Sequence, residues 1–228
     1  YLDRYLSRRS CGNVSFQLAS IASIFLASKI EETRPFRTSD FVTLSDGLFV
    51  PEDTPVFEAV ARLNHHLFNT LGFVGDRQDY ESPENSLLDS VIRDRKGIPI
   101  TLSLITMAVA ESVGVKMHGI GFPTHFLVAP ADALPRFFVD PFYSGRILTT
   151  DHLEPWFARI STQTGGRMPP LTWWLKPVNA RQILVRMNNN LQAAYLRQQD
   201  LKGALRCVER LLVLTPEAIE EHRKNLWT

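Results

Sequence analysis

The chain has 228 residues, of which 44% are hydrophobic and 21% charged, so it can bury one good core and is too apolar for disorder throughout. Its 25 basic residues nearly balance its 24 acidic ones, which gives no electrostatic footprint for nucleic acid or for an anionic membrane. This composition predicts one main globular domain with appended helices, and it sets nucleic acid and membranes aside as primary partners.

The two cysteines, Cys11 and Cys207, lie far apart and have neither metal-ligand spacing nor a disulfide framework around them. The most apolar window, residues 14–30, is interrupted by glutamine and serine and falls short of the roughly 20 apolar residues of a membrane span. The histidines also lack metal-ligand spacing. We therefore expect a reducing, cytoplasmic setting, no metal ion and no cofactor.

The first 50 residues are expected to form a helical segment. Apolar residues recur at helical spacing over residues 14–32, with a short helix before them over residues 1–7 and a third helix over about residues 39–47. Residues 51–55 are rich in proline and acidic residues, which predicts a boundary there.

Residues 51–175 are expected to form the main domain. An amphipathic helix is predicted over residues 56–71, polar turns over residues 75–85, and a short helix with Ser86 as its N-cap. Pro99 opens a further helix whose apolar run ends before Gly114.

After this helix the pattern changes from helical to extended. Residues 115–122, 124–129 and 136–139 are short β-rich runs separated by proline or glycine, which predicts neighbouring antiparallel strands. A helix followed by a small sheet predicts an α+β domain.

The chain is predicted to be helical again beyond residue 150, and residues 176–228 form the third expected region. Helices over residues 178–197 and 201–214 resemble a single tetratricopeptide-type helix pair. A lone pair cannot bury its apolar face unaided, so it is expected to dock on the core or to begin a longer array.

Three motifs follow one another in an order typical of thiol acyl-transfer enzymes. Gly97-Ile98-Pro99 leads into a helix, His125 lies in a predicted strand, and Asp140 ends the next strand. In such enzymes a cysteine at a helix N-terminus gains thiolate character, a histidine takes its proton, and a carboxylate orients the imidazole.

These motifs resemble those of the SirB-type transglutaminase-like family. The matching segments are Asn85-Ser86, Arg95-Lys96-Gly97-Ile98-Pro99-Ile100, Gly121-Phe122-Pro123-Thr124-His125-Phe126 and Asp140-Pro141-Phe142. With the C-terminal helices included, the resemblance covers about residues 55–228. It implies a transglutaminase-like core of helices packed on a small antiparallel sheet, flanked by N-terminal helices and by the C-terminal pair.

The resemblance implies a cleft with His125 and Asp140 as its catalytic or relic pair, and Asn85, Arg95 and Pro99 as binding positions. Where such cores carry the nucleophilic cysteine, this chain has Pro99, which offers no nucleophilic atom.

Two hydroxyls in the first turn of the same helix, Thr101 and Ser103, are alternative nucleophiles. Their other interpretation is a helix cap or a packed hydroxyl. His125 and Asp140 can likewise be a structural hydrogen-bonded pair, because a buried imidazole needs partners.

Residues 1–49 resemble part of a cyclin box. The string Leu26-Ala27-Ser28-Lys29-Ile30-Glu31-Glu32 carries the likeness, which implies that Lys29 contacts a cyclin-dependent kinase. The alternative is that this string is a solvated helix end, since the likeness covers about half a box and lacks the second charged contact.

Three functions remain open from the sequence. The leading hypothesis is a non-catalytic binding or regulatory protein, a pseudoenzyme, that engages a protein or peptide through a relic cleft and the C-terminal helices. The second is an acyl-transfer or hydrolase enzyme that uses a hydroxyl nucleophile. The third, which is disfavoured, is a cyclin-like regulator that binds a kinase through residues 1–49.

Overall fold

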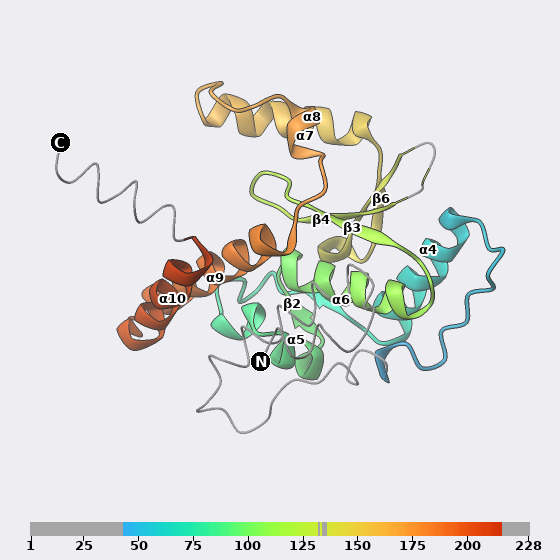
Figure 1. Cartoon of the computed structure of the whole chain (residues 1–228), viewed down its shortest axis with the longest axis horizontal. Coiled ribbons are helices and arrows are strands. Elements are labelled where there is room, and N and C mark those ends of the chain that lie inside the picture. The colour runs from blue at the N-terminus through green and yellow to red at the C-terminus, as the bar shows by residue number, and fades with distance from the viewer. Residues whose placement is uncertain (1–42, 132, 134–135, 216–228) are drawn as a thin grey trace.

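The computed structural model describes residues 43–131, 133 and 136–215, which form an α+β fold (Figure 1). The α-helices are α4 (Val56–Asn64), α5 (Leu88–Asp94), α6 (Pro99–Ser112), α7 (Thr150–Gln163), α8 (Leu171–Trp174), α9 (Ala180–Arg197) and α10 (Leu201–Leu214). The strands are β1 (Val74–Gly75), β2 (Lys96–Gly97), β3 (Met117–Ile120), β4 (Leu127–Pro130), β5 (Phe138–Asp140) and β6 (Arg146–Leu148). Shorter helical turns are η1 (His65–Thr70, a π-helix) and the 3-10 turns η2 (Pro83–Ser86) and η3 (Pro141–Tyr143).

The main sheet has four antiparallel strands in the order β3-β4-β5-β6. Val128 of β4 pairs with Gly119 of β3 on one side and with Val139 of β5 on the other. This register places the end of β5 near the start of β4. The predicted α+β class and antiparallel sheet are confirmed, whereas β6 was not predicted.

The sheet is buried on both faces. Val128 and Val139 belong to a large apolar core that also contains α4, α6 and α9, whereas Leu127 and Phe138 belong to a second core beneath α7 and α8. Figure 1 shows α6 on one side of the sheet and α7 with α8 on the other. Burial on both faces explains why β4 lacks the alternation of apolar and polar residues that marks a half-exposed strand.

Helix α6 is the central helix of the larger core. Every residue from 99 to 110 is buried, so the helix is apolar on all sides, as expected for a helix surrounded by other elements. Helix α9 packs against α6 and contributes Ile183, Leu184 and Met187 to the same core, and α10 packs along α9. The C-terminal helix pair therefore docks on the α+β core.

Several local predictions need correction. The helix predicted over residues 56–71 is helical throughout, but its second half is the π-helix η1. Ser86 does not cap α5, because it ends η2 and Leu87 takes the N-cap position without a side-chain hydrogen bond. The polar segment near residue 75 contains β1, which pairs in parallel with β2.

The expected N-terminal helices over residues 1–7 and 14–32 lie outside the described residues. Of the helix predicted over residues 39–47, only Thr43 and Leu44 are helical among the described positions. Leu44 is buried in the larger core, and its carbonyl accepts a hydrogen bond from Nε2 of His66 at 2.8 Å. Within the described ranges, no helix has the length and apolarity needed to cross a membrane.

The start of α6 is fixed by the hydroxyl of Thr101. This fully buried group accepts a hydrogen bond from the backbone N–H of Ile98 (3.1 Å) and donates one to the carbonyl of Asn85 (2.9 Å). A Cβ at Gly97, the last residue of β2, would lie 2.8 Å from the same oxygen, so this position before the helix favours glycine. Thr101 therefore joins α6 to η2.

We predict that Thr101→Val lowers the free energy of unfolding by about 2 kcal/mol, because it leaves a buried N–H and a buried carbonyl without partners. Thr106→Val is the matched control on the same helix, since Thr106 is also fully buried but donates only to the Leu102 carbonyl four residues earlier. It should cost less than about 1 kcal/mol. Urea denaturation measures both, and equal losses would contradict the capping role.

Candidate functional site

His125 lies in the turn that leads into β4. The preceding residue, Thr124, has a left-handed backbone (φ 59°), and the N–H of His125 donates to the Phe122 carbonyl at 3.1 Å. The side chain is only about 7% exposed. The prediction that His125 lies on a strand is therefore wrong. His125 belongs to the turn, and β4 begins two residues later, at Leu127.

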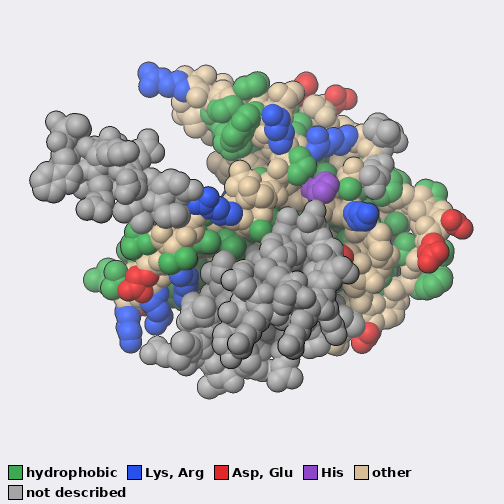
Figure 2. Space-filling view, viewed as in Figure 1, with side chains coloured by type: hydrophobic (Ala, Val, Ile, Leu, Met, Phe, Trp, Pro, Cys, Tyr) green, Lys and Arg blue, Asp and Glu red, His purple; other side chains and the backbone are tan. Residues whose placement is uncertain are grey.

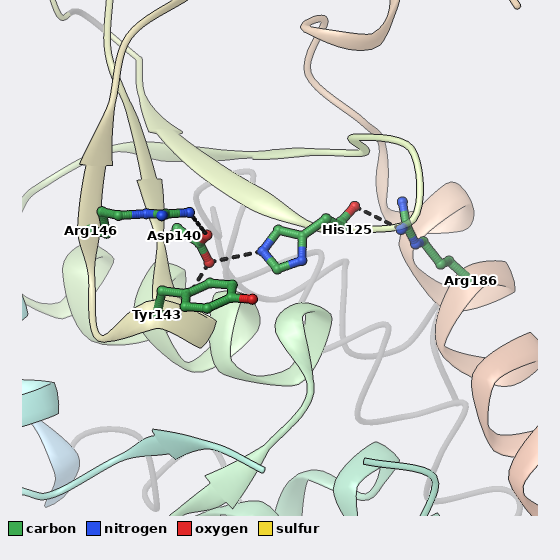
Figure 3. Close-up of polar contacts among 5 residues, drawn as sticks. All are labelled: His125, Asp140, Tyr143, Arg146 and Arg186. Atoms are coloured by element: carbon green, nitrogen blue, oxygen red, sulfur yellow. Dashed lines mark hydrogen bonds and ion pairs between the residues drawn. The ribbon is translucent and has the colours of Figure 1, made fainter. Parts of the chain in front are cut away.

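The imidazole of His125 is hydrogen-bonded to Asp140, as predicted. Its Nε2 lies 2.9 Å from Oδ1 of Asp140, which is fully buried at the end of β5 (Figure 3). Because an ionised carboxylate only accepts hydrogen bonds, Nε2 carries the proton. In the neutral ring Nδ1 then presents its lone pair, and it has no hydrogen-bond partner among the described residues.

Asp140 has two further partners. Its Oδ2 accepts from Nη2 of Arg146 at 3.2 Å, and Oδ1 lies 3.4 Å from the backbone N–H of Tyr143. Arg146 comes from β6 and is half exposed, so the buried carboxylate is paired with a side chain that reaches the protein surface. A buried charge needs such partners to offset its lost hydration.

Aromatic rings and arginines surround the histidine. The ring centre of His125 lies 5.0 Å from Trp156, and 6.0 Å from both Phe142 and Tyr143. The guanidinium carbons of Arg77 and Arg146 lie 4.6 and 4.8 Å from the centre of the Tyr143 ring, distances typical of cation–π contacts. Figure 2 shows Lys and Arg side chains at several places on this face of the molecule.

The backbone of the histidine turn is held by Arg186 of α9. Nη2 of Arg186 donates to the His125 carbonyl at 2.7 Å, and Nη1 donates to the Phe122 carbonyl at 3.1 Å (Figure 3). Burial lowers the pKa of Arg186 from its usual value. Sequence reasoning missed this residue, because it lies in an ordinary helical pattern 61 positions after His125.

The other predicted binding positions support the start of α6. The Asn85 side chain is buried and donates to the Asp79 carbonyl at 2.6 Å. Arg95 has a left-handed backbone (φ 58°) and stacks on Phe73 at 4.6 Å, and Pro99 is the buried first residue of α6. Lys29 lies outside the described residues.

The candidate nucleophiles occupy different environments. The Thr101 hydroxyl is occupied by its capping hydrogen bonds, whereas the buried Ser103 hydroxyl has no partner among the described residues. Cys207 is a buried free thiol on α10, and burial raises its pKa, which keeps it neutral near pH 7. Within the described ranges, no group of three His, Cys, Asp or Glu side chains could hold a metal ion.

We predict that the Nε2–H of His125 gives a slowly exchanging proton resonance in the neutral protein, because the hydrogen bond to a buried carboxylate protects it. The ¹⁵N shift of Nδ1 should be that of an unprotonated ring nitrogen. Asp140→Ala should abolish the protected resonance, and exposed His118 on β3 is the internal control that exchanges quickly. A protonated Nδ1 in the neutral ring would contradict the assigned tautomer.

Comparison with known proteins gives the site its context. The chain is 37% identical over 168 residues to a UPF0162 protein of Xylella fastidiosa, a match that covers 72% of this chain and 58% of that protein. A UPF0162 protein of Vibrio cholerae is 32% identical over 167 residues, covering 71% of this chain and 57% of that protein. The chain therefore spans little more than half the length of these bacterial relatives.

Other matches come from eukaryotes. F-box only protein 21 of Mus musculus is 28% identical over 204 residues, covering 84% of this chain and 31% of that protein. The G2/mitotic-specific cyclin cig2 of Schizosaccharomyces pombe is 40% identical over 86 residues, covering 38% of this chain and 19% of the cyclin. No solved structure matches. The family profile described as Transglutaminase-like superfamily matches residues 31–189, more than half of the chain, which therefore belongs to this superfamily.

Proposed function

We propose that this protein is a non-catalytic binding or regulatory member of its superfamily, which holds a protein or peptide partner at the His125 site and along the C-terminal helices. The observation that carries the proposal is an imidazole fixed by Asp140, with Nδ1 unpaired among the described residues, next to a helix that begins with Pro99. Such a nitrogen accepts a hydrogen bond from a partner amide without any bond being broken.

The surroundings of His125 suit a peptide group. Half-exposed Tyr143 and partly buried Trp156 offer aromatic surface next to the imidazole, and half-exposed Arg146 offers donors at the rim. Aromatic and arginine side chains are the types enriched at protein interfaces. The match to F-box only protein 21 covers about a third of that protein, so a related sequence occurs as one part of a larger chain.

The second candidate function is an acyl-transfer or hydrolase enzyme, with His125 as base and Asp140 as the group that orients it. The Thr101 hydroxyl is occupied by its hydrogen bonds to Ile98 and Asn85, whereas that of Ser103 is without a partner in the described part of the chain. The mechanism therefore requires the Ser103 hydroxyl to come within hydrogen-bond reach of His125. Ser103 is fully buried, however, so a substrate could reach it only after the site opens.

Selection of phage-displayed random peptides against the protein tests the proposal. We expect selected peptides to bind at least about tenfold more weakly to His125→Ala, since the variant loses the acceptor that reads the peptide. His118→Ala is the matched control, because this histidine is exposed on β3. Failure to find any peptide that depends on His125 would contradict the proposal.

The same peptides separate binding from catalysis. Mass spectrometry should show each peptide unchanged after long incubation with the protein. Iodoacetamide should leave binding intact, because α6 begins with Pro99 and offers no thiol there. A cleaved or deamidated peptide, formed by the protein and lost in Ser103→Ala, would establish the enzyme instead.

A cyclin-like role through residues 1–49 is the third candidate, and the match of 86 residues to a fission yeast cyclin is the comparison that favours a cyclin-like part of the chain. We predict no submicromolar binding to a cyclin-dependent kinase, because the segment supplies only one of the two charged contacts that the resemblance implies. Titration of a purified kinase with the chain and with Lys29→Ala measures this. Tight binding that Lys29→Ala weakens about tenfold would promote the cyclin-like role.

A further inference from the structure

A cavity lies beside the histidine turn, between the segment after α7 and helix α9. Its volume is about 340 Å³, at the lower end of the size range of ligand pockets. The lining residues are Gly121, Phe126, Trp173, Trp174, Lys176, Pro177, Val178, Gln182 and Arg186. The walls are thus mostly apolar and aromatic, and the charged residues are one lysine and one arginine.

The cavity contains two tryptophans, one of which is ordered and yet half exposed to solvent. Trp173 is 50% exposed, and its ring centre lies 4.7 Å from that of Trp174, whose indole N–H donates to the Pro169 carbonyl at 3.2 Å. The pair is therefore held in place while one ring remains open to solvent. An ordered, exposed tryptophan is the side chain most typical of an interface hot spot.

Arg186 brings to the cavity a positive charge that lies 5.6 Å from the centre of the Phe126 ring and is not paired with a carboxylate among the described residues. Its hydrogen bonds to the carbonyls of Phe122 and His125 leave its positive charge in place, because both acceptors are neutral. Within the described ranges, no carboxylate forms an ion pair with it, and none lines the cavity. A partly buried cation is costly to leave unpaired, so a bound anion would relieve a penalty that the fold already carries.

We infer that this cavity, here named the Trp173 pocket, binds an acidic segment of a protein partner by placing an apolar side chain on the tryptophans and a neighbouring carboxylate on Arg186 and Lys176. Charge complementarity selects this occupant, since two cations line the pocket and no anion does. The inference deepens the proposed function and rests on it for the existence of a partner. It occupies its own site, whose lining residues do not include His125 or Asp140.

The pocket and the His125 site share one structural element. Arg186 lines the pocket and also donates a hydrogen bond to the carbonyl of His125. A carboxylate bound to its guanidinium would therefore lie close to the histidine turn. The partner segment is therefore expected to cover both sites together.

The test uses two blocked peptides, acetyl-Leu-Glu-Leu-amide and acetyl-Leu-Gln-Leu-amide, titrated to millimolar concentrations into the ¹⁵N-labelled chain. The four tryptophans give separate indole resonances. We expect the glutamate peptide to shift those of Trp173 and Trp174 and to bind at least about tenfold more tightly than the glutamine peptide, since a carboxylate forms a charge-assisted bond with guanidinium.

Three variants sharpen the result. Arg186→Gln should reduce the difference in affinity between the two peptides, with Lys176 as the remaining cation, Trp173→Ala should weaken both about tenfold without disturbing the fold, and Arg197→Gln should change neither. Arg197 is the matched control because it is an exposed arginine on the same helix, paired with Glu81 at 3.1 Å. Trp173→Ala keeps the test decisive if Arg186→Gln disturbs the histidine turn.

Trp156 separates this inference from the proposed function, because its ring lies 5.0 Å from that of His125. A glutamate peptide that shifts Trp156 alone would overturn the Trp173 pocket and leave the His125 site standing. Equal shifts with both peptides, or no shift of Trp173 and Trp174, would also overturn the inference. Selected peptides that depend on Trp173 but not on His125 would support the pocket and count against the proposed function.

Discussion

The constraint on which the site depends is a single carboxylate, that of Asp140, buried where β5 ends. A buried charge is tolerated only when it is well paired, and Asp140 meets this condition with the imidazole of His125 on one oxygen and Arg146 on the other. These two partners come from different parts of the chain. The carboxylate thereby fixes how the turn before β4 lies against β6.

The histidine turn is anchored a second time through its backbone. Arg186 of α9 donates to the carbonyls of Phe122 and His125, while the His125 side chain is held by Asp140. The imidazole is therefore positioned by two elements: by the sheet through Asp140 and by α9 through Arg186. This arrangement makes α9 part of the site, and the same helix packs into the main core through Ile183, Leu184 and Met187.

The sequence predicted those features that show as a hydrophobic pattern over many residues or as an ordered set of motifs. The apolar run of α6, the antiparallel strands and the His125–Asp140 pair followed from periodicity and motif order, and the alternative reading of Thr101 as a cap matches its hydrogen bonds. Strands β1 and β2 have two residues each, too few to show a period.

Other features depend on tertiary contacts that no local pattern encodes. Arg186 reads as one more polar residue of an amphipathic helix, and only the folded chain brings it to the His125 carbonyl. The two tryptophans likewise lie in a helix of four residues, α8, and only the folded chain places Lys176 and Arg186 around the same cavity. The order of the motifs therefore identified His125 and Asp140. It did not identify Arg186, which positions the histidine turn, or the Trp173 pocket.

Asp140 and His125 are expected to act as one structural unit. A double-mutant cycle of His125→Ala and Asp140→Ala, measured as free energies of unfolding in urea, tests this coupling. We expect a coupling energy of about 1–2 kcal/mol, because each single variant already removes the shared hydrogen bond. Additive effects within about 0.5 kcal/mol would contradict it, since they would mean that the two side chains contribute independently.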